Sequence, residues 1–155
     1  MAEGTGRATF APAVFYQDPV AALDWLEKAF SFERTMVITD DDGNIGHAEM
    51  GLGNGTGYIM VGSEWEERTK SPKSLAGKNT QNVHVQLTSD VDAHCARARS
   101  GGATIVQEPE DQFYGDRVYR ALDLEGHVWT FGQNIRKVSR EEAEKASGLK
   151  IEGWI

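Results

Sequence analysis

The chain has 155 residues, of which 39% are hydrophobic and 26% charged, a composition typical of one globular domain. Its formal net charge of −8 argues against a nucleic acid partner, because a phosphate backbone favours basic surface. A single cysteine excludes an internal disulfide and a cysteine-rich metal cluster, which fits a reducing compartment. Since no apolar stretch is long enough to span a bilayer and the first ten residues lack a signal-peptide pattern, we expect a cytoplasmic protein with no membrane partner.

The first half of the chain, residues 9–63, predicts one strand, one helix and then three strands. A short apolar and aromatic run at 9–16 is typical of a strand. Asp18 and Pro19 then stand where a helix cap and first turn belong, and Leu23, Leu26 and Phe30 follow at helical spacing. Turn-forming residues separate the three later strands, which we expect at 34–39, 45–50 and 58–63.

The second half, residues 80–133, repeats this order after a polar connection. We expect a strand at 82–88, and a helix at 91–100 that Asp90 caps and Gly101 ends. Three strands follow at 103–108, 117–123 and 128–134, with a loop over 108–116. The chain is therefore predicted to be an α+β protein of two βαβββ units.

The remaining residues, 134–155, predict a C-terminal helix and a tail. Ser139 is in the position of a helix cap, with Glu142 in the capping-box position. The tail ends on apolar residues that include Trp154. Such an end is expected to fold back on the domain or to cover a partner subunit.

Several local motifs resemble the vicinal oxygen chelate superfamily, in its glyoxalase/bleomycin resistance protein/dioxygenase-like branch. They are Asp18-Pro19 with AALDWLEKAFSFE, DDDGNIGHAEM with GYIMVGS, DVDAHCARARSGGATIVQEPEDQFYGDR, and ALDLEGHVWTFGQ. The most specific part is YGDR followed by D-x-E-G-H-x-W-x-F. The resemblance implies one domain over 1–133, with the two units forming a curled, eight-stranded mixed sheet around a ligand cleft, in a protein that pairs as a homodimer.

The resemblance also implies four strand positions at which metal-using members carry His, Gln or Glu. Three of them fall here on Ala11, Met60 and Thr130. On the fifth strand, direct counting gives Val83, but strand alternation gives another register. It places Val83, Val85 and Leu87 against the helix and Asn82, His84 and Gln86 toward the cleft, which moves the ligand position to Asn82. No position of the set is clearly occupied, so we expect no metal and no cofactor.

The other candidate residues each have two interpretations. His47 and Glu49 share one face of a strand and, with His84, form a possible non-standard metal site; alternatively His47 is a half-buried histidine bonded to a neighbour. His127 is expected in a turn, His94 exposed on a helix, and Cys95 in the core. Beside Asp116, Arg117 either orients a ligand carboxylate or pairs with an acid across the loop, and we expect Trp129 and Phe131 to pack on a helix.

We expect the ligand cleft to be lined by neutral polar and aromatic side chains. Strand residues His84, Gln86, Phe15 and Thr130 line it, and the loop residues Tyr114 and Trp65 close its mouth. One hypothesis is a metal-free binding protein for a small flat or cationic molecule. The other is a metal-dependent lyase or dioxygenase that uses His47, Glu49 and His84, and catalytic residues stay unassigned in both.

Overall fold

The computed structural model describes residues 7–53 and 56–154, and it confirms the α+β fold with two four-stranded mixed sheets. The first unit contains β1 (Ala13–Tyr16), α1 (Pro19–Phe30), β2 (Glu33–Thr39), β3 (Ile45–Gly51) and β4 (Ile59–Ser63). Its strands lie in the order β1-β4-β3-β2, with β1 and β4 parallel and the other pairs antiparallel.

The second unit repeats the first. A short 3-10 helix, η1 (Pro72–Leu75), precedes β5 (Val83–Leu87), α2 (Val91–Ser100), β6 (Thr104–Asp111), β7 (Asp116–Leu122) and β8 (Val128–Asn134). The strand order is β5-β8-β7-β6, with β5 and β8 parallel. A last helix, α3 (Arg140–Ser147), follows. None of the helices in the described part of the chain is long and apolar enough to cross a membrane.

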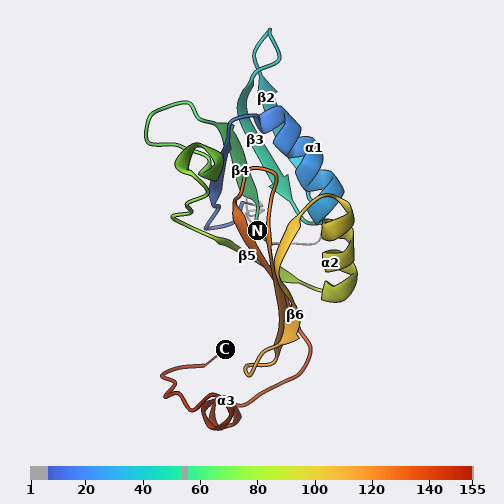
Figure 1. Cartoon of the computed structure of the whole chain (residues 1–155), viewed down its shortest axis with the longest axis vertical. Coiled ribbons are helices and arrows are strands. Elements are labelled where there is room, and N and C mark those ends of the chain that lie inside the picture. The colour runs from blue at the N-terminus through green and yellow to red at the C-terminus, as the bar shows by residue number, and fades with distance from the viewer. Residues whose placement is uncertain (1–6, 54–55, 155) are drawn as a thin grey trace, which may run out of the picture.

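The two main helices, α1 and α2, lie side by side on one side of the sheets, whereas the short η1 lies on the other side of the first sheet (Figure 1). Helix α3 lies beyond the second sheet, at the end of the molecule remote from the first (Figure 1). Because α1 and α2 pack on the same side, the opposite face of each sheet is left for a site.

The predicted helix caps are present. Asp18 accepts a hydrogen bond from the Ala21 N–H at 3.0 Å, and Asp90 accepts one from the Ala93 N–H at 3.0 Å. Ser139 and Glu142 form the expected capping box at the start of α3. These caps satisfy backbone donors that the first turn of a helix leaves unpaired, which explains why the helix starts were readable from the sequence.

The hydrophobic core is continuous between the units. Leu23, Leu26 and Phe30 of α1 are fully buried, as predicted, and so are Trp129 and Phe131 of β8. The Phe30 ring lies 4.8 Å from that of Phe131 and 5.5 Å from that of Trp129, measured between centroids. Cys95 is buried, also as predicted. The units therefore share one core and are not two independent lobes.

The D-x-E-G-H-x-W segment joins the two units by hydrogen bonds. The Asp123 carboxylate accepts from the Tyr16 hydroxyl at 2.6 Å and from the Trp129 indole N–H at 3.0 Å. Glu125 accepts from the backbone N–H groups of Gln17 and Asp18, at 2.7 and 3.0 Å. The most specific motif of the sequence is thus a structural connection between the end of β1 and the β7–β8 turn.

One predicted boundary in the second unit was wrong. Strand β6 runs to Asp111, through residues that were expected to form a loop, because it pairs with β7 as far as Arg117. Pro109 is tolerated there because β6 is an edge strand with a register shift between Gln107 and Glu110. Helix η1, within the polar connection, was not predicted.

Candidate functional site

The face of β5 that points away from the helices is polar. Val83 and Val85 lie opposite Trp129 and Phe131 of β8 and pack toward the core. His84 and Gln86 alternate with them, lie opposite Thr130 and Gly132, and are exposed. The structure therefore has the alternation that the sequence predicted for this strand, with His84 on the open face.

Hydrogen bonds fix the side chains on this face in a chain. The Gln86 amide donates to Asp116 at 3.0 Å, so its oxygen is left to accept from His84 Nε2 at 3.1 Å. Asn134 donates to the other oxygen of Asp116 at 2.8 Å. Because Nε2 must carry the proton in this arrangement, a neutral His84 presents Nδ1 as an acceptor on the open face.

Tyr114 lies near the Asp116 end of these hydrogen-bonded side chains. It lines, with Gln86 and Asp116, a cavity of about 370 Å³ whose other wall includes Trp154 of the C-terminal tail. Burial, and secondarily the nearby Asp116 charge, raise the pKa of the Tyr114 hydroxyl, so it stays protonated and can donate. Trp154 was missed as a site residue; its only signal in the sequence was an aromatic residue near an unusually apolar chain end.

Thr130 lies beside His84 but is committed to a neighbour. It is buried, and its hydroxyl accepts a hydrogen bond from the Arg120 Nε–H at 3.2 Å. Arg120 lies opposite Thr130 in the β7–β8 register, so its side chain shares the open face. A ligand on this face would meet Arg120 before it meets Thr130.

Phe15 and Trp65, which were also predicted to line the cleft, do not lie near His84 and Gln86. Phe15 belongs to the first sheet, and it lines a cavity of about 140 Å³ with His127 and Thr69. Trp65 follows β4 and is 69% exposed. Four of the predicted cleft residues therefore lie near one another: Gln86 and Tyr114 line one cavity, and His84 lies beside Gln86 and opposite Thr130. Phe15 and Trp65 lie apart from them.

Another cavity, of about 270 Å³, is lined by residues of both units and includes His84. Its lining includes His84 and Gln86 of β5, Phe10 ahead of β1, and Tyr58 just before β4. Phe10 is 86% exposed, so this wall of the cavity reaches the surface. Sequence alone could not pair Phe10 with His84, because the contact depends on how the two sheets are joined.

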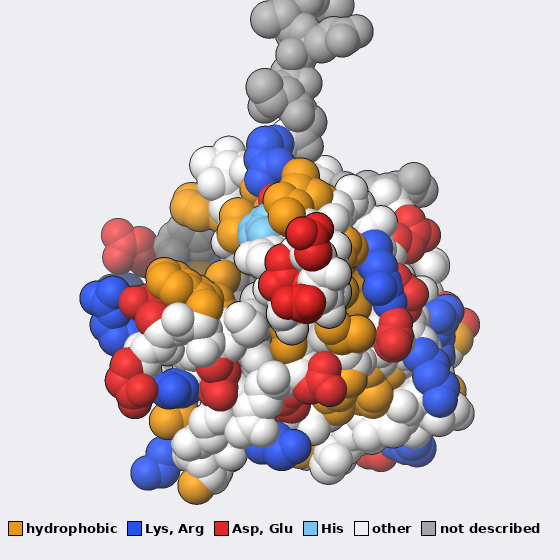
Figure 2. All heavy atoms as spheres, turned by 90° about the horizontal axis from the view of Figure 1, so that it is seen from above, with side chains coloured by type: hydrophobic (Ala, Val, Ile, Leu, Met, Phe, Trp, Pro, Cys, Tyr) orange, Lys and Arg blue, Asp and Glu red, His pale blue; other side chains and the backbone are white. Residues whose placement is uncertain are grey.

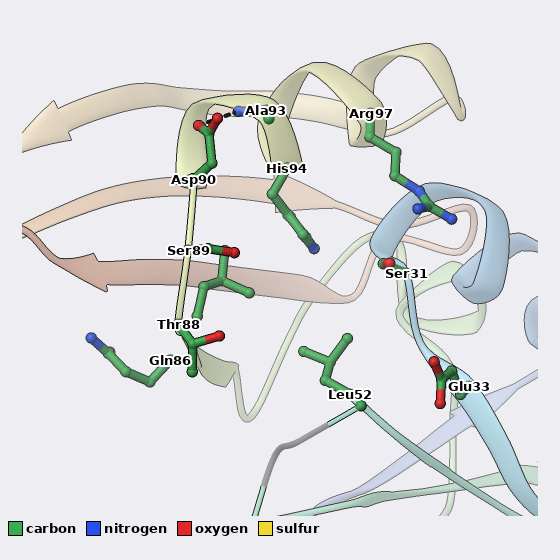
Figure 3. A pocket seen from close by; sticks show the side chains of 12 residues that line it. Ser31, Glu33, Leu52, Gln86, Thr88, Ser89, Asp90, Ala93, His94 and Arg97 are labelled. Carbon is green, nitrogen blue, oxygen red and sulfur yellow. Dashed lines mark hydrogen bonds between the residues drawn. The ribbon is translucent and has the colours of Figure 1, made fainter.

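The cavity between the end of α1 and the start of α2 has a volume of about 450 Å³ (Figure 3). Figure 3 shows Arg97 reaching from α2 toward the end of α1 near Ser31, and its guanidinium donates to the carbonyls of Lys28 and Glu27, each at 3.0 Å. Asp90 is occupied as a helix cap. Arg97 therefore links α2 to the end of α1, and Asp90 caps α2, so both charged groups have structural roles.

His94, which borders the cavity between α1 and α2, was predicted to be exposed, and that prediction was wrong. The ring is partly buried: Nε2 donates to the Phe30 carbonyl at 2.8 Å, and Nδ1 lies 2.6 Å from the Tyr119 hydroxyl. Burial lowers the pKa of His94, because the charged imidazolium is poorly solvated there. The sequence showed polar neighbours along the helix, but it could not show that α1 packs against this side.

The expectations for Arg117 and His127 have mixed outcomes. Arg117 pairs with Asp92 and with Asp111, at 3.1 and 2.8 Å, so the pairing across the loop exists but not with Asp116. His127 lies in the β7–β8 turn as predicted, and its Nε2 donates to the Phe15 carbonyl at 2.7 Å. Both side chains have structural partners.

The open face of the first sheet carries a separate charged cluster. The Glu49 carboxylate on β3 accepts from Arg7 at 2.8 and 3.4 Å, and His47 Nε2 lies 3.1 Å from Glu49 Oε1. The same guanidinium donates to the Tyr58 hydroxyl at 2.7 Å. Its bond to Arg7 is the main reason that the pKa of Glu49 is lowered, so Glu49 is ionised at neutral pH.

The residues at the superfamily's metal positions do not fit a metal. Ala11 has no donor atom, Met60 offers only a thioether, and the Thr130 hydroxyl is already bonded to Arg120. Among the residues that the structure describes, no three or more His, Cys, Asp or Glu side chains are grouped to hold a metal ion. His47 and Glu49 do touch, but His84 is bonded to Gln86 in the other sheet.

The fold and the open faces define a class of protein with paired βαβββ units. A family model described as the Glyoxalase/Bleomycin resistance protein/Dioxygenase superfamily matches residues 9–131, and the chain belongs to this superfamily.

Particular relatives are found among sequences and structures. The uncharacterized protein Mb0911c of Mycobacterium bovis is 32% identical over 146 residues, which cover 92% of this chain and 93% of that protein. TioX from Micromonospora sp. ML1 has 34% identity and a TM-score of 0.64, with 85% of this chain and 100% of that chain covered. TnmS3, an antibiotic binding protein from Streptomyces sp. CB03234, shares the fold at 19% identity and a TM-score of 0.63, over 82% and 97% of the two chains.

Proposed function

We propose that this chain is a binding protein that holds a small, planar organic molecule without a metal and without changing it chemically. The observation that carries this proposal is the series of hydrogen bonds that joins His84, Gln86 and Asp116 beside Tyr114, on the sheet face opposite α1 and α2. Side chains whose orientations are already fixed lose little conformational entropy when a ligand arrives.

The chemistry of this face suits a planar ring system that carries few polar groups. Tyr114 and Trp154 provide aromatic surface for stacking, and His84 Nδ1 and the Tyr114 hydroxyl provide one acceptor and one donor. The antibiotic-binding TnmS3 has the same fold, which supports a cleft of this architecture as a place for such a molecule.

We also propose that the binding form is a homodimer. Strand β2, at one edge of the first sheet, is exposed along its whole length, although it carries Met36, Val37 and Ile38 with exposed fractions of 39, 39 and 52%. On the face viewed in Figure 2, hydrophobic side chains reach the surface among acidic and basic ones. A second copy that covers β2 would remove both the apolar exposure and the unpaired strand edge.

Two planar dyes test the proposed function: ethidium, which is cationic, and anilinonaphthalene sulfonate, which is anionic. We expect at least one to bind saturably with one site per chain, measured by its fluorescence, and His84→Ala and Gln86→Ala to weaken that binding. Glu108→Gln, a surface carboxylate paired with Arg99, is the matched control and should leave binding unchanged. If neither dye saturates, or if the substitutions have no effect, the proposal is wrong.

Metal content separates this function from a metal-dependent lyase or dioxygenase. Protein purified without chelators should hold less than stoichiometric metal by elemental analysis, and addition of divalent ions should not change dye binding. A stoichiometric ion that is lost from a His47→Ala variant would instead favour the enzyme with the non-standard site.

A further inference from the structure

The cluster on the open face of the first sheet is built like a receptor for a planar cation. Glu49 is only 6% exposed, and it presents both carboxylate oxygens to one guanidinium. The Arg7 guanidinium carbon lies 4.8 Å from the centre of the Tyr58 ring, while the Tyr58 hydroxyl accepts a further bond from it. A two-oxygen carboxylate contact with an adjacent aromatic ring is the environment that best recognises a guanidinium or amidinium group.

The group that fills this receptor comes from the chain's own N-terminal segment. Arg7 precedes β1, and its side chain is 49% exposed, whereas the side chain of Glu49 is 8% exposed. Apart from Arg7, the bonding partner of Glu49 is His47, on the same strand. The receptor is thus formed by β3 and by Tyr58 just before β4, and its occupant, Arg7, lies ahead of the first strand.

We propose that Glu49, Tyr58 and His47 form a subsite for a guanidinium or amidinium group of the ligand, and that Arg7 occupies this subsite as an internal competitor until the ligand displaces it. The inference rests on the proposed binding function and extends it, because it names the chemical class of one part of the ligand. Tyr58 also lines the cavity that contains His84, so a molecule could contact both places.

The burial of Glu49 explains why the subsite should stay filled. A carboxylate in a largely buried position loses solvation, and it needs a cation or several donors to compensate. When Arg7 leaves, His47 is the partner that Glu49 keeps among the described residues, and a ligand cation can restore the lost pair. Arg7 gives up less on leaving, because half of its side chain is already in water.

The test uses methylguanidinium as the probe and the full chain as the protein, with binding followed by NMR shifts of the Glu49 and Tyr58 backbone amides. If Arg7 fills the subsite for about nine-tenths of the time, its removal should strengthen probe binding about tenfold. We therefore expect Arg7→Ala to bind methylguanidinium about tenfold more tightly than the unmodified protein. Arg68→Ala, which removes another surface Arg–Glu pair, should bind the probe as the unmodified protein does.

A double variant shows where the probe binds. Arg7→Ala with Glu49→Gln should lose the saturable shifts, while circular dichroism confirms that it remains folded. Equal affinity in Arg7→Ala and the unmodified protein, or saturable binding that survives in the double variant, would overturn the proposal. The dye experiment is independent: if dye binding depends on His84 but methylguanidinium does not respond to Arg7, the binding function stands and only the cation subsite fails.

Discussion

The Tyr16 hydroxyl and the Asp123 carboxylate form a buried hydrogen bond of 2.6 Å between residues that are 107 positions apart in the chain. Tyr16 is fully buried at the end of β1, and Asp123 is 7% exposed in the β7–β8 turn. Burial, with the Asp123 charge as a second cause, raises the pKa of Tyr16 well above its ordinary value, so the phenol remains the donor throughout the physiological range. This bond fastens the first unit to the second.

Removing that hydroxyl should destabilise the whole domain. Tyr16→Phe leaves a buried carboxylate with one donor fewer, and we expect a loss of about 1–3 kcal/mol in the free energy of unfolding, measured by urea denaturation. Tyr58→Phe is the matched control, because its hydroxyl bond to Arg7 is exposed, and it should change stability by less than about 0.5 kcal/mol. Equal effects of the two substitutions would contradict the role of Tyr16.

The buried side of α1 can be tested by one truncation. Leu26 is fully buried in the core, so Leu26→Ala should lower the free energy of unfolding by about 2–5 kcal/mol through the cavity that it leaves. Val20 lies on the same helix but is 47% exposed, and Val20→Ala should cost far less. Thermal unfolding of the two variants measures the difference, and an unchanged melting temperature for Leu26→Ala would show that the helix packs by another face.

His94 should make stability depend on pH. Its pKa is lowered in the folded state, so below about pH 6.5 the unfolded chain binds more protons than the folded one. The stabilising contribution of neutral His94 is complete above that pH and is lost as the pH falls through the folded-state pKa. We expect the stability difference between the unmodified protein and His94→Gln to shrink from pH 7.5 to pH 5 in urea titrations, whereas a constant difference would be inconsistent with a buried neutral imidazole.

The alternation of β5 gives opposite effects at neighbouring positions. His84→Ala should weaken dye binding and leave the melting temperature nearly unchanged, because the side chain is exposed. Val85 is partly buried against the core, so Val85→Ala should lower stability by about 1–3 kcal/mol with less effect on binding. The reverse outcome would mean that Val85 and not His84 faces the ligand.

Light scattering tests the proposed dimer. At micromolar concentration the protein should have twice the mass of the 17.1 kDa chain, because pairing would cover the exposed apolar residues of β2. Val37→Lys and Ile38→Lys, both on β2, should shift the mass toward the monomer, while Val106→Lys on β6 shows whether the second sheet edge is involved as well. A monomer mass for the unmodified protein would count against the dimer.

The sequence by itself determined the elements and their order, because helix caps, glycine turns and strand alternation are local signals. Asp18 and Asp90 marked both long helices, and the alternation of β5 placed His84 on the open face. Boundaries failed where a partner decided them: β6 continues past Pro109 because β7 offers a strand to pair with.

Contacts between the units were decided only by the tertiary structure. The residues around Tyr16 in the sequence do not indicate its partner Asp123, because that bond forms when one unit packs on the other. The bonds of His94 to Phe30 and of Arg7 to Glu49 likewise depend on how separate segments pack together. For the same reason, the six predicted cleft residues separated into a group on the second sheet and two that lie elsewhere. Strand alternation predicts the face on which a side chain lies, whereas the packing of the two sheets decides which faces meet.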